Sequence, residues 1–240
     1  MSGTPPRTAD LFDAVELTWP AARLHRAGPW LIREGQGGGK RVSAASLLGE
    51  TPDIAQMETE QAALDQAPLV MIRAGQEALD TALAEAGYAR VDPVMVLVAP
   101  ARDMCADLPP DTGFTVDWPP LAAQVEIWEE GGIGPARIAV MDRCMLPRTT
   151  LLGRVGDKPA ATAYVALHED IAMLHALEVR APYRRAGLGR QMMQAAAGWG
   201  VAQGAQWMAV LVVEQNVAAQ GLYQRLGMRP AGHYHYRIRK

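Results

Sequence analysis

The order of predicted elements between residue 171 and the C-terminus constrains the fold of this chain more than any other feature. Apolar periodicity and glycine stops predict strands alternating with helices there: strand 171–179, helix 187–203, strand 207–213, helix 217–226 and a strand over the tail, 234–239. Two further strands, near 149–155 and 161–169, lead into this series. A meander followed by strand–helix–strand–helix–strand predicts an α/β or α+β fold with a mixed sheet.

Upstream of residue 149 the pattern is less regular. It predicts helices near 8–18, after 51–52, and at 76–88, 121–130 and 134–143, and strands at 68–73 and 94–99. The segments 29–34 and 41–46 flank Gly-Gln-Gly-Gly-Gly-Lys, an arrangement that predicts a hairpin with a flexible tip. This glycine run lacks the spacing of a phosphate-binding loop, with Arg41 where the hydroxyl belongs, so nucleotide binding is not expected there.

A proline- and aspartate-rich stretch over 100–113 divides the 240 residues into two halves. The strand–helix–strand order of 68–99 resembles that of 207–239, which indicates an internal duplication with diverged sequence. We therefore expect an N-terminal half over 1–105 and a second domain over 113–240.

Composition narrows the class of protein. Apolar residues make up 49% of the chain and charged residues 20%, which excludes wholesale disorder. The net charge of −3 does not suggest a nucleic-acid partner, the apolar runs are too short for a membrane span, and the N-terminus lacks a signal core. These features predict a cytoplasmic protein with no membrane partner. Neither the two separated cysteines nor His233 and His235 form a metal-ligand pattern, so no metal is expected.

The strongest candidate site is Arg184-Arg185-Ala186-Gly187-Leu188-Gly189-Arg190, between a predicted strand and a predicted helix. Amides at a helix N-terminus are unpaired, and the helix dipole favours an anion there. Glycine lets a phosphate approach the backbone, and the arginines add positive charge. The segment is therefore a candidate pyrophosphate cradle, although a solvated basic turn at a helix start has the same pattern.

The run Leu-Glu-Val-Arg-Ala-Pro-Tyr-Arg-Arg-Ala-Gly-Leu-Gly-Arg resembles the acyl-CoA signature of the GNAT N-acetyltransferase superfamily. Asn216, with Tyr223 seven positions on and Leu-Gly-Met after it, is similar to the second signature of that family. The resemblance covers about 113–240 well. The first half is similar only to the degenerate half of tandem GNAT proteins and lacks the cradle run.

This resemblance implies an acetyl-CoA-dependent N-acetyltransferase with a duplicated (tandem) GNAT fold, in which a primary amine attacks the thioester directly. The backbone of Leu177, Glu178 and Val179 is expected to pair with the pantetheine arm, and Arg184 to Arg190 to hold the pyrophosphate. Asn216 is expected near the pantetheine or between the strands, and Tyr223 to protonate the departing thiolate. An acyl-CoA-binding regulatory relic without turnover is the alternative.

The base and the acceptor stay open at this point. Glutamates that serve as the base in some family members are replaced here by Leu211 and Met173. The nearest titratable groups are His175, on the same strand face as Met173, and then Glu178 and Glu214. His175 is the candidate base because its pKa suits neutral pH, and a water chain serves equally well. The acceptor is a small-molecule or peptide amine, with a pocket expected from 113–150. Residues 1–110 carry nine basic and fifteen acidic side chains, a net −6, which suggests recruitment of a cationic acceptor. No pattern indicates an oligomeric state.

Overall fold

The structure is a computed structural model that describes residues 4–109 and 112–239. The helices are α1 (Thr8–Thr18), α2 (Lys40–Ser43), α3 (Ile54–Ala63), α4 (Glu77–Glu85), α5 (Ala101–Met104), α6 (Ala122–Glu130), α7 (Pro135–Arg143), α8 (Leu188–Ala202) and α9 (Val217–Arg225). The strands are β1 (Arg23–Ala27), β2 (Trp30–Glu34), β3 (Ser46–Leu47), β4 (Leu69–Arg73), β5 (Ala89–Pro100), β6 (Gly113–Val116), β7 (Arg148–Val155), β8 (Lys158–His168), β9 (Ile171–Val179), β10 (Trp207–Val213) and β11 (Arg229–Ile238). No helix in these described ranges is long and apolar enough to cross a membrane.

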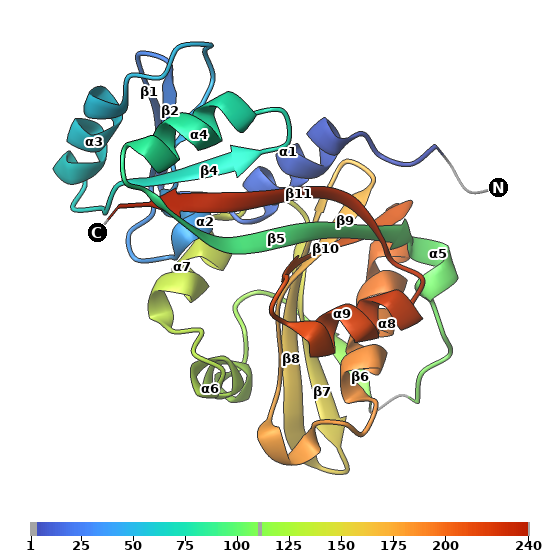
Figure 1. Ribbon diagram of the computed structural model, residues 1–240. Coiled ribbons are helices and arrows are strands. Elements are labelled where there is room, and N and C mark those ends of the chain that lie inside the picture. The colour runs from blue at the N-terminus through green and yellow to red at the C-terminus, as the bar shows by residue number, and fades with distance from the viewer. Residues whose placement is uncertain (1–3, 110–111, 240) are drawn as a thin grey trace.

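One mixed sheet runs through both halves of the chain. Its eight strands lie in the order β4-β11-β5-β10-β9-β8-β7-β6, and β1, β2 and β3 form a separate small sheet at one end of the molecule (Figure 1). Neighbouring strands pair antiparallel except β9 and β10, which are parallel and are connected through α8. The mixed α/β sheet predicted from the sequence is confirmed.

The two halves exchange their last strands. Strand β11 of the second half lies between β4 and β5 of the first, while β5 pairs with β10 of the second half (Figure 1). The exchange is symmetric in register. Val213 of β10 pairs with Val94 of β5, and Arg73 of β4 pairs with Tyr234 of β11. Val213 lies 140 positions after Arg73, and Tyr234 lies 140 positions after Val94. Helices α4 and α9 also begin 140 positions apart, at Glu77 and Val217. The internal repeat is therefore a structural one.

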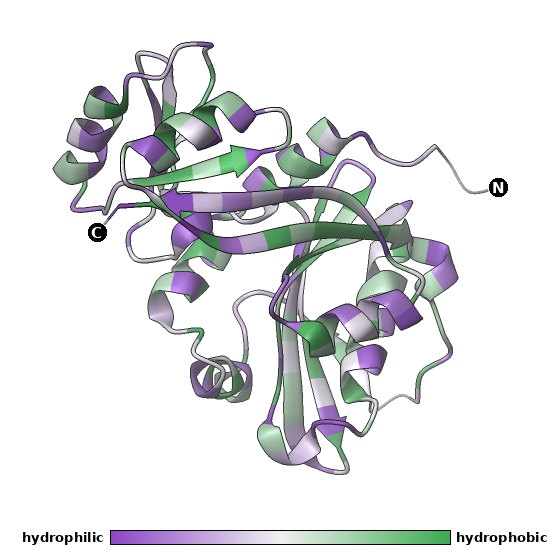
Figure 2. Cartoon of the chain, in the orientation of Figure 1, coloured by the Kyte–Doolittle hydropathy of each residue, from purple (hydrophilic) through white to green (hydrophobic). Residues whose placement is uncertain are grey.

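Apolar side chains fill both faces of the sheet. On one face α8 buries Leu188, Met192, Met193, Ala196 and Ala197 against β8, β9 and β10. On the other face α1 buries Leu11, Phe12 and Val15 against strands from both halves. Figure 2 shows the corresponding hydrophobic colouring along β4 and much of β5. Burial on this scale, at about 25 cal/mol per Å² of apolar surface, is the main force that holds the two halves together.

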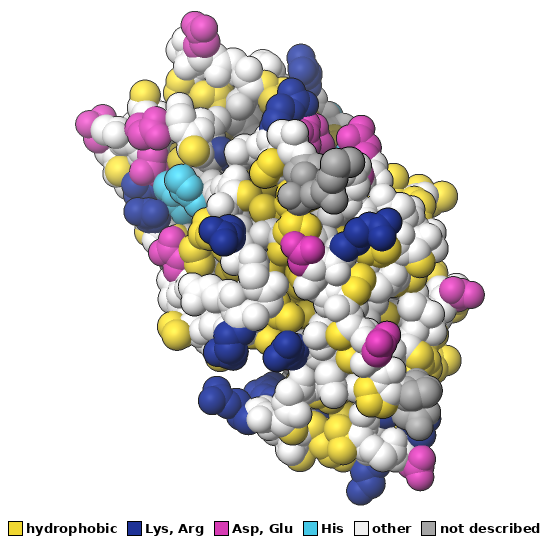
Figure 3. Space-filling model, turned by 90° about the vertical axis from the view of Figure 1, so that its right-hand side faces the viewer, with side chains coloured by type: hydrophobic (Ala, Val, Ile, Leu, Met, Phe, Trp, Pro, Cys, Tyr) yellow, Lys and Arg dark blue, Asp and Glu magenta, His cyan; other side chains and the backbone are white. Residues whose placement is uncertain are grey.

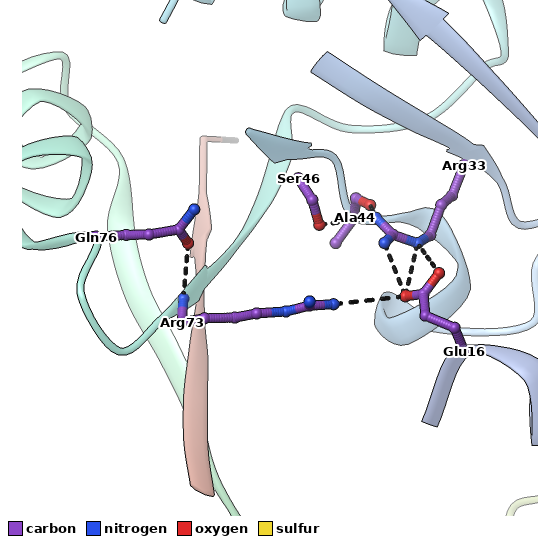
Figure 4. Close-up of polar contacts among 6 residues, drawn as sticks. All are labelled: Glu16, Arg33, Ala44, Ser46, Arg73 and Gln76. Atoms are coloured by element: carbon purple, nitrogen blue, oxygen red, sulfur yellow. Dashed lines mark hydrogen bonds and ion pairs between the residues drawn. The ribbon is translucent and has the colours of Figure 1, made fainter. Parts of the chain in front are cut away.

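A buried ion network ties α1 to β2 and β4 of the first half. Arg33 of β2 is 2% exposed and donates to Glu16 of α1, to the Ala44 carbonyl oxygen at 2.6 Å and to Ser46 Oγ at 2.9 Å (Figure 4). Arg73 reaches the same carboxylate at 3.7 Å. Because a buried charge without a partner is costly, Glu16 holds the position of α1 over the sheet.

The hairpin prediction is correct only in part: β2 pairs antiparallel with β3, Trp30 with Leu47 and Leu31 with Ser46, but the connection between them is not a simple tip. Strand 29–34 pairs with β1, which precedes it and was not predicted, across the turn at Gly28. Segment 41–46 forms the short helix α2 followed by the two-residue β3. The glycines explain the difference: Gly37 and Gly39 adopt positive φ angles of 76° and 99°, so the run curls into α2 instead of forming a hairpin tip.

Candidate active site

Strands β9 and β10 part in the middle of the sheet. Their parallel pairing ends at Leu174 and Val210, whereas β9 stays paired with β8 as far as Val179 and β10 with β5 as far as Val213. Beyond Leu174 the edge of β9 that faces β10 therefore pairs with none of the described strands. Unpaired backbone groups on a strand edge form a template for an extended ligand.

A β-bulge lies at the point of separation. Ala176 has a φ of 52°, and the register between β8 and β9 shifts between Thr162 and Tyr164. The indole Nε1 of buried Trp128 donates to the Ala176 carbonyl oxygen at 2.8 Å and so fixes this conformation. A bulge bends its strand and re-aims the side chains that follow, so it contributes directly to the opening of the sheet.

The three residues after the bulge face in two directions. Leu177 and Val179 pack against the apolar cluster beneath α8. Glu178, which lies between them, faces the opposite side, and its carboxyl group packs against Gly131 at the end of α6. The contact is so close that a Cβ added to Gly131 would lie 2.5 Å from the carboxyl carbon. Burial raises the pKa of the half-buried Glu178, and Arg184 and Arg137 offset part of that rise. Such a carboxylate is a stronger base than an exposed one.

The predicted cradle lies at the start of α8. Gly187 precedes the helix with a φ of 86°, and Arg185 also adopts a left-handed φ of 67°. Arg184, Arg185, Ala186 and Arg190 are exposed. Seen from the side that carries α5 and α8, basic side chains gather around a hollow at the lower left of the molecule (Figure 3). Open helix amides, a left-handed glycine and exposed guanidinium groups suit a pyrophosphate.

Several residues near the cradle have structural partners. Arg184 Nε donates to the Val179 carbonyl oxygen at 2.8 Å, which ties the cradle to the open end of β9. Arg180 is ion-paired with Glu130 of α6 at 2.9 Å. Leu188 is buried, and a Cβ on Gly189 would meet Leu222 of α9 at 3.4 Å, an ordinary packing contact. Of the two glycines, Gly187 is thus the one that the backbone conformation requires.

Asn216 and Tyr223 belong to α9, beside the same opening. The Asn216 side-chain oxygen accepts from the Ala219 amide at 3.1 Å, so this residue caps the helix. Tyr223 is 7% exposed and belongs to the same apolar cluster as Leu174 and Val212, which flank the point of separation. Burial and the charge of Glu178 raise the pKa of Tyr223 to about 12, so the phenol stays protonated at neutral pH.

His175 is buried on the opposite face of β9, and both of its ring nitrogens are engaged. Arg41 Nη1 lies 3.0 Å from Nδ1, and Thr18 Oγ1 lies 2.8 Å from Nε2. Because a guanidinium only donates, Nδ1 accepts and Nε2 carries the proton. Burial and the charge of Arg41 lower the pKa of His175 well below 6.5. A neutral ring whose lone pair is already occupied is poorly suited to take a proton from an amine.

A pocket of about 250 Å³ opens on the face of the sheet opposite α8. His175 and Ala176 of β9 and Leu211 and Val213 of β10 form its floor, so it spans the separation of the two strands. Its walls come mainly from the first half: Trp19, Gly38, Gly39, Lys40, Arg41, Asp92 and Val94. Ile133 and Arg137 are the only lining residues from 113–150, where the sequence analysis placed the acceptor pocket.

The basic residues of this pocket were not predicted as site residues. Lys40 and Arg41 follow the glycine run, and nothing local to that run indicates that it meets β9 more than 130 residues away. The signal available in the sequence was the run of three glycines beside two basic residues. Gly39 adopts a φ of 99°, a conformation that favours glycine, and the chain there runs beside Arg137, whose Nε would lie 3.6 Å from a Cβ on Gly39.

The equivalent positions of the first half lack the same features. Helix α3, which precedes β4, begins at Asp53, whose carboxylate accepts from the Gln56 amide and fills the helix N-terminus. Leu83 occupies the place of Tyr223, 140 positions earlier, and Ala45, which precedes β3, forms an isolated parallel bridge with Val70 of β4. An acidic cap and an absent phenol do not suit a CoA ligand.

Comparisons with known proteins agree with this geometry. Residues 115–228 match the model of the Acetyltransferase (GNAT) family. YobR, an uncharacterized N-acetyltransferase of Bacillus subtilis (strain 168), is 27% identical over 236 residues, which cover 93% of this chain and 95% of YobR.

Solved structures share the fold over nearly the whole chain. A GCN5-related N-acetyltransferase from Kribbella flavida matches with a TM-score of 0.66 and 20% identity, over 98% of this chain and 96% of the other. A tandem GNAT protein from the clavulanic acid biosynthesis pathway matches with a TM-score of 0.60 and 13% identity, over 99% and 89%. At such identities the likeness concerns the fold alone.

Proposed function

Because this chain is an acetyltransferase of the GNAT superfamily, we propose that it moves an acetyl group from acetyl-CoA to a primary amine, which attacks the thioester directly. Acetyl-CoA would lie along the open edge of β9, with its pyrophosphate at the start of α8. The amine would approach from the pocket on the opposite face. In this proposal 113–240 is the catalytic domain and 1–105 a degenerate half that binds no cofactor but forms most of the acceptor pocket.

The observation that carries the proposal is the separation of β9 and β10, because the gap between these strands is open to both faces of the sheet and the two faces carry different groups. The basic N-terminus of α8 lies on one side of the sheet. The pocket lies on the other side, with Ala176 and Leu211 at its floor. A thioester held in the gap would be reached from both sides. Amides on the open edge of β9 are suited to stabilise the developing oxyanion.

The residues along β9, at the start of α8 and in α9 would each contact a different part of CoA. The backbone of Leu177, Glu178 and Val179 would pair with the pantetheine amides, as an added strand does. Gly187 and the guanidinium groups of Arg185 and Arg190 would hold the pyrophosphate. With a pKa of about 12, Tyr223 keeps its proton at neutral pH and can donate it to the departing thiolate.

In place of His175, we assign the role of base to the Glu178 side chain. Its carboxylate lies on the face opposite Leu177 and Val179, and burial raises its pKa. A raised pKa improves the ability of a carboxylate to accept a proton, directly or through one water. His175 becomes a positioning residue, because it accepts the hydrogen bond that holds Arg41.

The test combines calorimetry with CoA and mass spectrometry of a panel of primary amines incubated with acetyl-CoA. We expect saturable CoA binding and a mass increase of one acetyl group on at least one amine. Acetyl transfer without dependence on Tyr223 and Glu178 would overturn the roles assigned here. The absence of CoA binding would overturn the proposed function.

A further inference from the structure

The charges of the acceptor pocket carry an inference that rests on the proposed function and goes beyond it. We infer that the acceptor is a small amine that also bears a carboxylate, held by the guanidinium groups of Arg41 and Arg137. The acceptor class would then be amino acids or molecules with the same amine–carboxylate pair, rather than polyamines or simple alkylamines.

The pocket is electropositive at the place where the acceptor would lie. Three basic side chains line it, Lys40, Arg41 and Arg137, against one carboxylate, Asp92. Lys40 and Asp92 neutralise each other in an ion pair of 2.8 Å. Among the described residues no carboxylate lies within ion-pair distance of Arg41 or Arg137, so both guanidinium groups are open to a ligand, although the charge of Arg137 also acts on nearby Glu178. The net −6 of residues 1–110 is therefore not the charge that the acceptor would meet.

Arg41 is held in place from two sides but is not saturated. Its Nη1 donates to His175, and its guanidinium lies 5.4 Å from the Trp19 ring centroid, within cation–π range. The Nε atom is buried and has no hydrogen-bond partner among the residues that the structure describes. A buried donor without a partner is costly in a folded protein, and a bound anion would offset that cost.

Arg137 approaches the same space from α7. It is exposed at the third position of that helix, and its Nε lies close to Gly39, two residues before Arg41. Both guanidinium-bearing residues therefore line one pocket, Arg41 from the first half and Arg137 from α7. Arginine is the side chain best matched to a carboxylate, because its planar fork can form two parallel hydrogen bonds.

The size of the pocket limits the acceptor further. A volume of about 250 Å³ lies below the roughly 300–1,000 Å³ of pockets that hold drug-sized ligands. Trp19, Ile133, Tyr234 and Tyr236 provide apolar walls, which favour an acceptor with an apolar side chain. An amine one carbon away from a bound carboxylate would stay near the floor at Ala176, where the strands part.

The test compares acids with their amides, which match them in size and lack the negative charge. Glycine, leucine, phenylalanine and glutamate, each with its α-amide, are titrated into the CoA-loaded full chain by calorimetry. We expect at least one acid to bind at least tenfold more tightly than its amide. Arg41→Gln and Arg137→Gln should each remove most of this preference, while Arg26→Gln, an exposed arginine outside the pocket, should retain it. Phosphoethanolamine tests whether a phosphate can replace the carboxylate.

Binding and turnover are measured separately, so that two failures can be told apart. Amides that bind as tightly as their acids, or no acid that binds below about 10 mM, would overturn the inference even if amines are acetylated. A preference for acids without acetyl transfer would support the anion site and overturn the proposed function. The loss of acid preference in the two arginine variants is a local effect if both variants still bind CoA and keep the unfolding temperature of the unchanged chain. Stronger binding of phosphoethanolamine than of every acid would overturn the assignment to carboxylates.

Discussion

Arg41 Nη1 donates a hydrogen bond to His175 Nδ1 across 3.0 Å, and this contact connects the glycine-rich segment of the first half to the central strand of the second. The pair also defines the protonation of the ring, because the guanidinium can only donate. His175 is consequently neutral in the folded chain, and it is expected to affect stability and acceptor binding rather than proton transfer.

The first prediction concerns His175 and pH. Its folded pKa lies well below 6.5, whereas the unfolded value is about 6.5, so below that pH only the unfolded chain takes up the proton. Stability attributable to His175 is thus present above pH 6.5 and is lost as pH falls, by at most about 1.4 kcal/mol per pH unit. Urea unfolding at pH 7 and pH 5 should show a smaller loss for His175→Gln than for the unchanged chain.

Exposed His233 is the matched control, since His233→Gln should keep the pH dependence of the unchanged chain. A pH dependence that is identical in all three proteins would show that His175 titrates normally. In the acceptor assay, His175→Gln should raise KM more than it lowers kcat, because the loss acts through Arg41. A change confined to kcat would instead support the role of base.

The second prediction concerns Tyr223 as the proton donor. Tyr223→Phe should lower kcat by about 10²-fold or more and leave CoA affinity unchanged, since general acids contribute about 10²–10⁴-fold. Steady-state thiol release and calorimetry measure the two quantities. Tyr88→Phe removes a phenol from the first half, where it bonds Glu58, and should leave kcat unchanged. Equal rates for Tyr223→Phe and the unchanged chain would exclude the donor role.

The third prediction concerns Glu178 as the base. Because its pKa is raised, kcat/KM should fall on the acid side at a pH above the ordinary range of a glutamate. Glu178→Gln should remove this acid limb and lower kcat/KM by about 10²-fold. The pH–rate profile with an acceptor of constant ionisation checks both statements. A limb that persists in Glu178→Gln must belong to another group.

The elements that carry the cradle could be predicted because their signals are local. A glycine before α8, arginines around it and an apolar stripe after it lie within a few turns of one another, and the structure places each as expected. The same holds for α9, where Asn216 caps and Gly227 ends the helix region.

The acceptor side could not be predicted in this way. Its pocket depends on the exchange of β5 and β11 and on the bulge at Ala176, which are pairings between segments far apart in the chain. A strand's periodicity reports which residues face the core, not which strand it will pair with. For the same reason, the overall charge of the first half was a poor guide to the few side chains that reach the pocket.

The fourth prediction uses Gly187, where a φ of 86° restricts the choice of residue. Asparagine and aspartate both tolerate this conformation and have nearly the same shape, so they differ mainly in charge. Gly187→Asp should weaken CoA binding at least tenfold more than Gly187→Asn, because a negative charge at a helix start repels a pyrophosphate. Calorimetry at low and high salt measures both, and the gap should narrow as salt rises. Equal affinities would place the pyrophosphate elsewhere.

The last prediction follows from the strand exchange. Both neighbours of β11 in the sheet, β4 and β5, belong to the first half, and β10 also pairs with β5. A fragment of 113–240 therefore loses every partner of its last strand and exposes an unpaired edge of β10, a known route to aggregation. We expect this fragment alone to aggregate or dimerise and to form a 1:1 complex when co-expressed with 1–105. Size-exclusion chromatography and circular dichroism distinguish these states. A folded monomer of 113–240 that binds CoA would mean that β10 and β11 can pair directly and that the first half is dispensable for the fold.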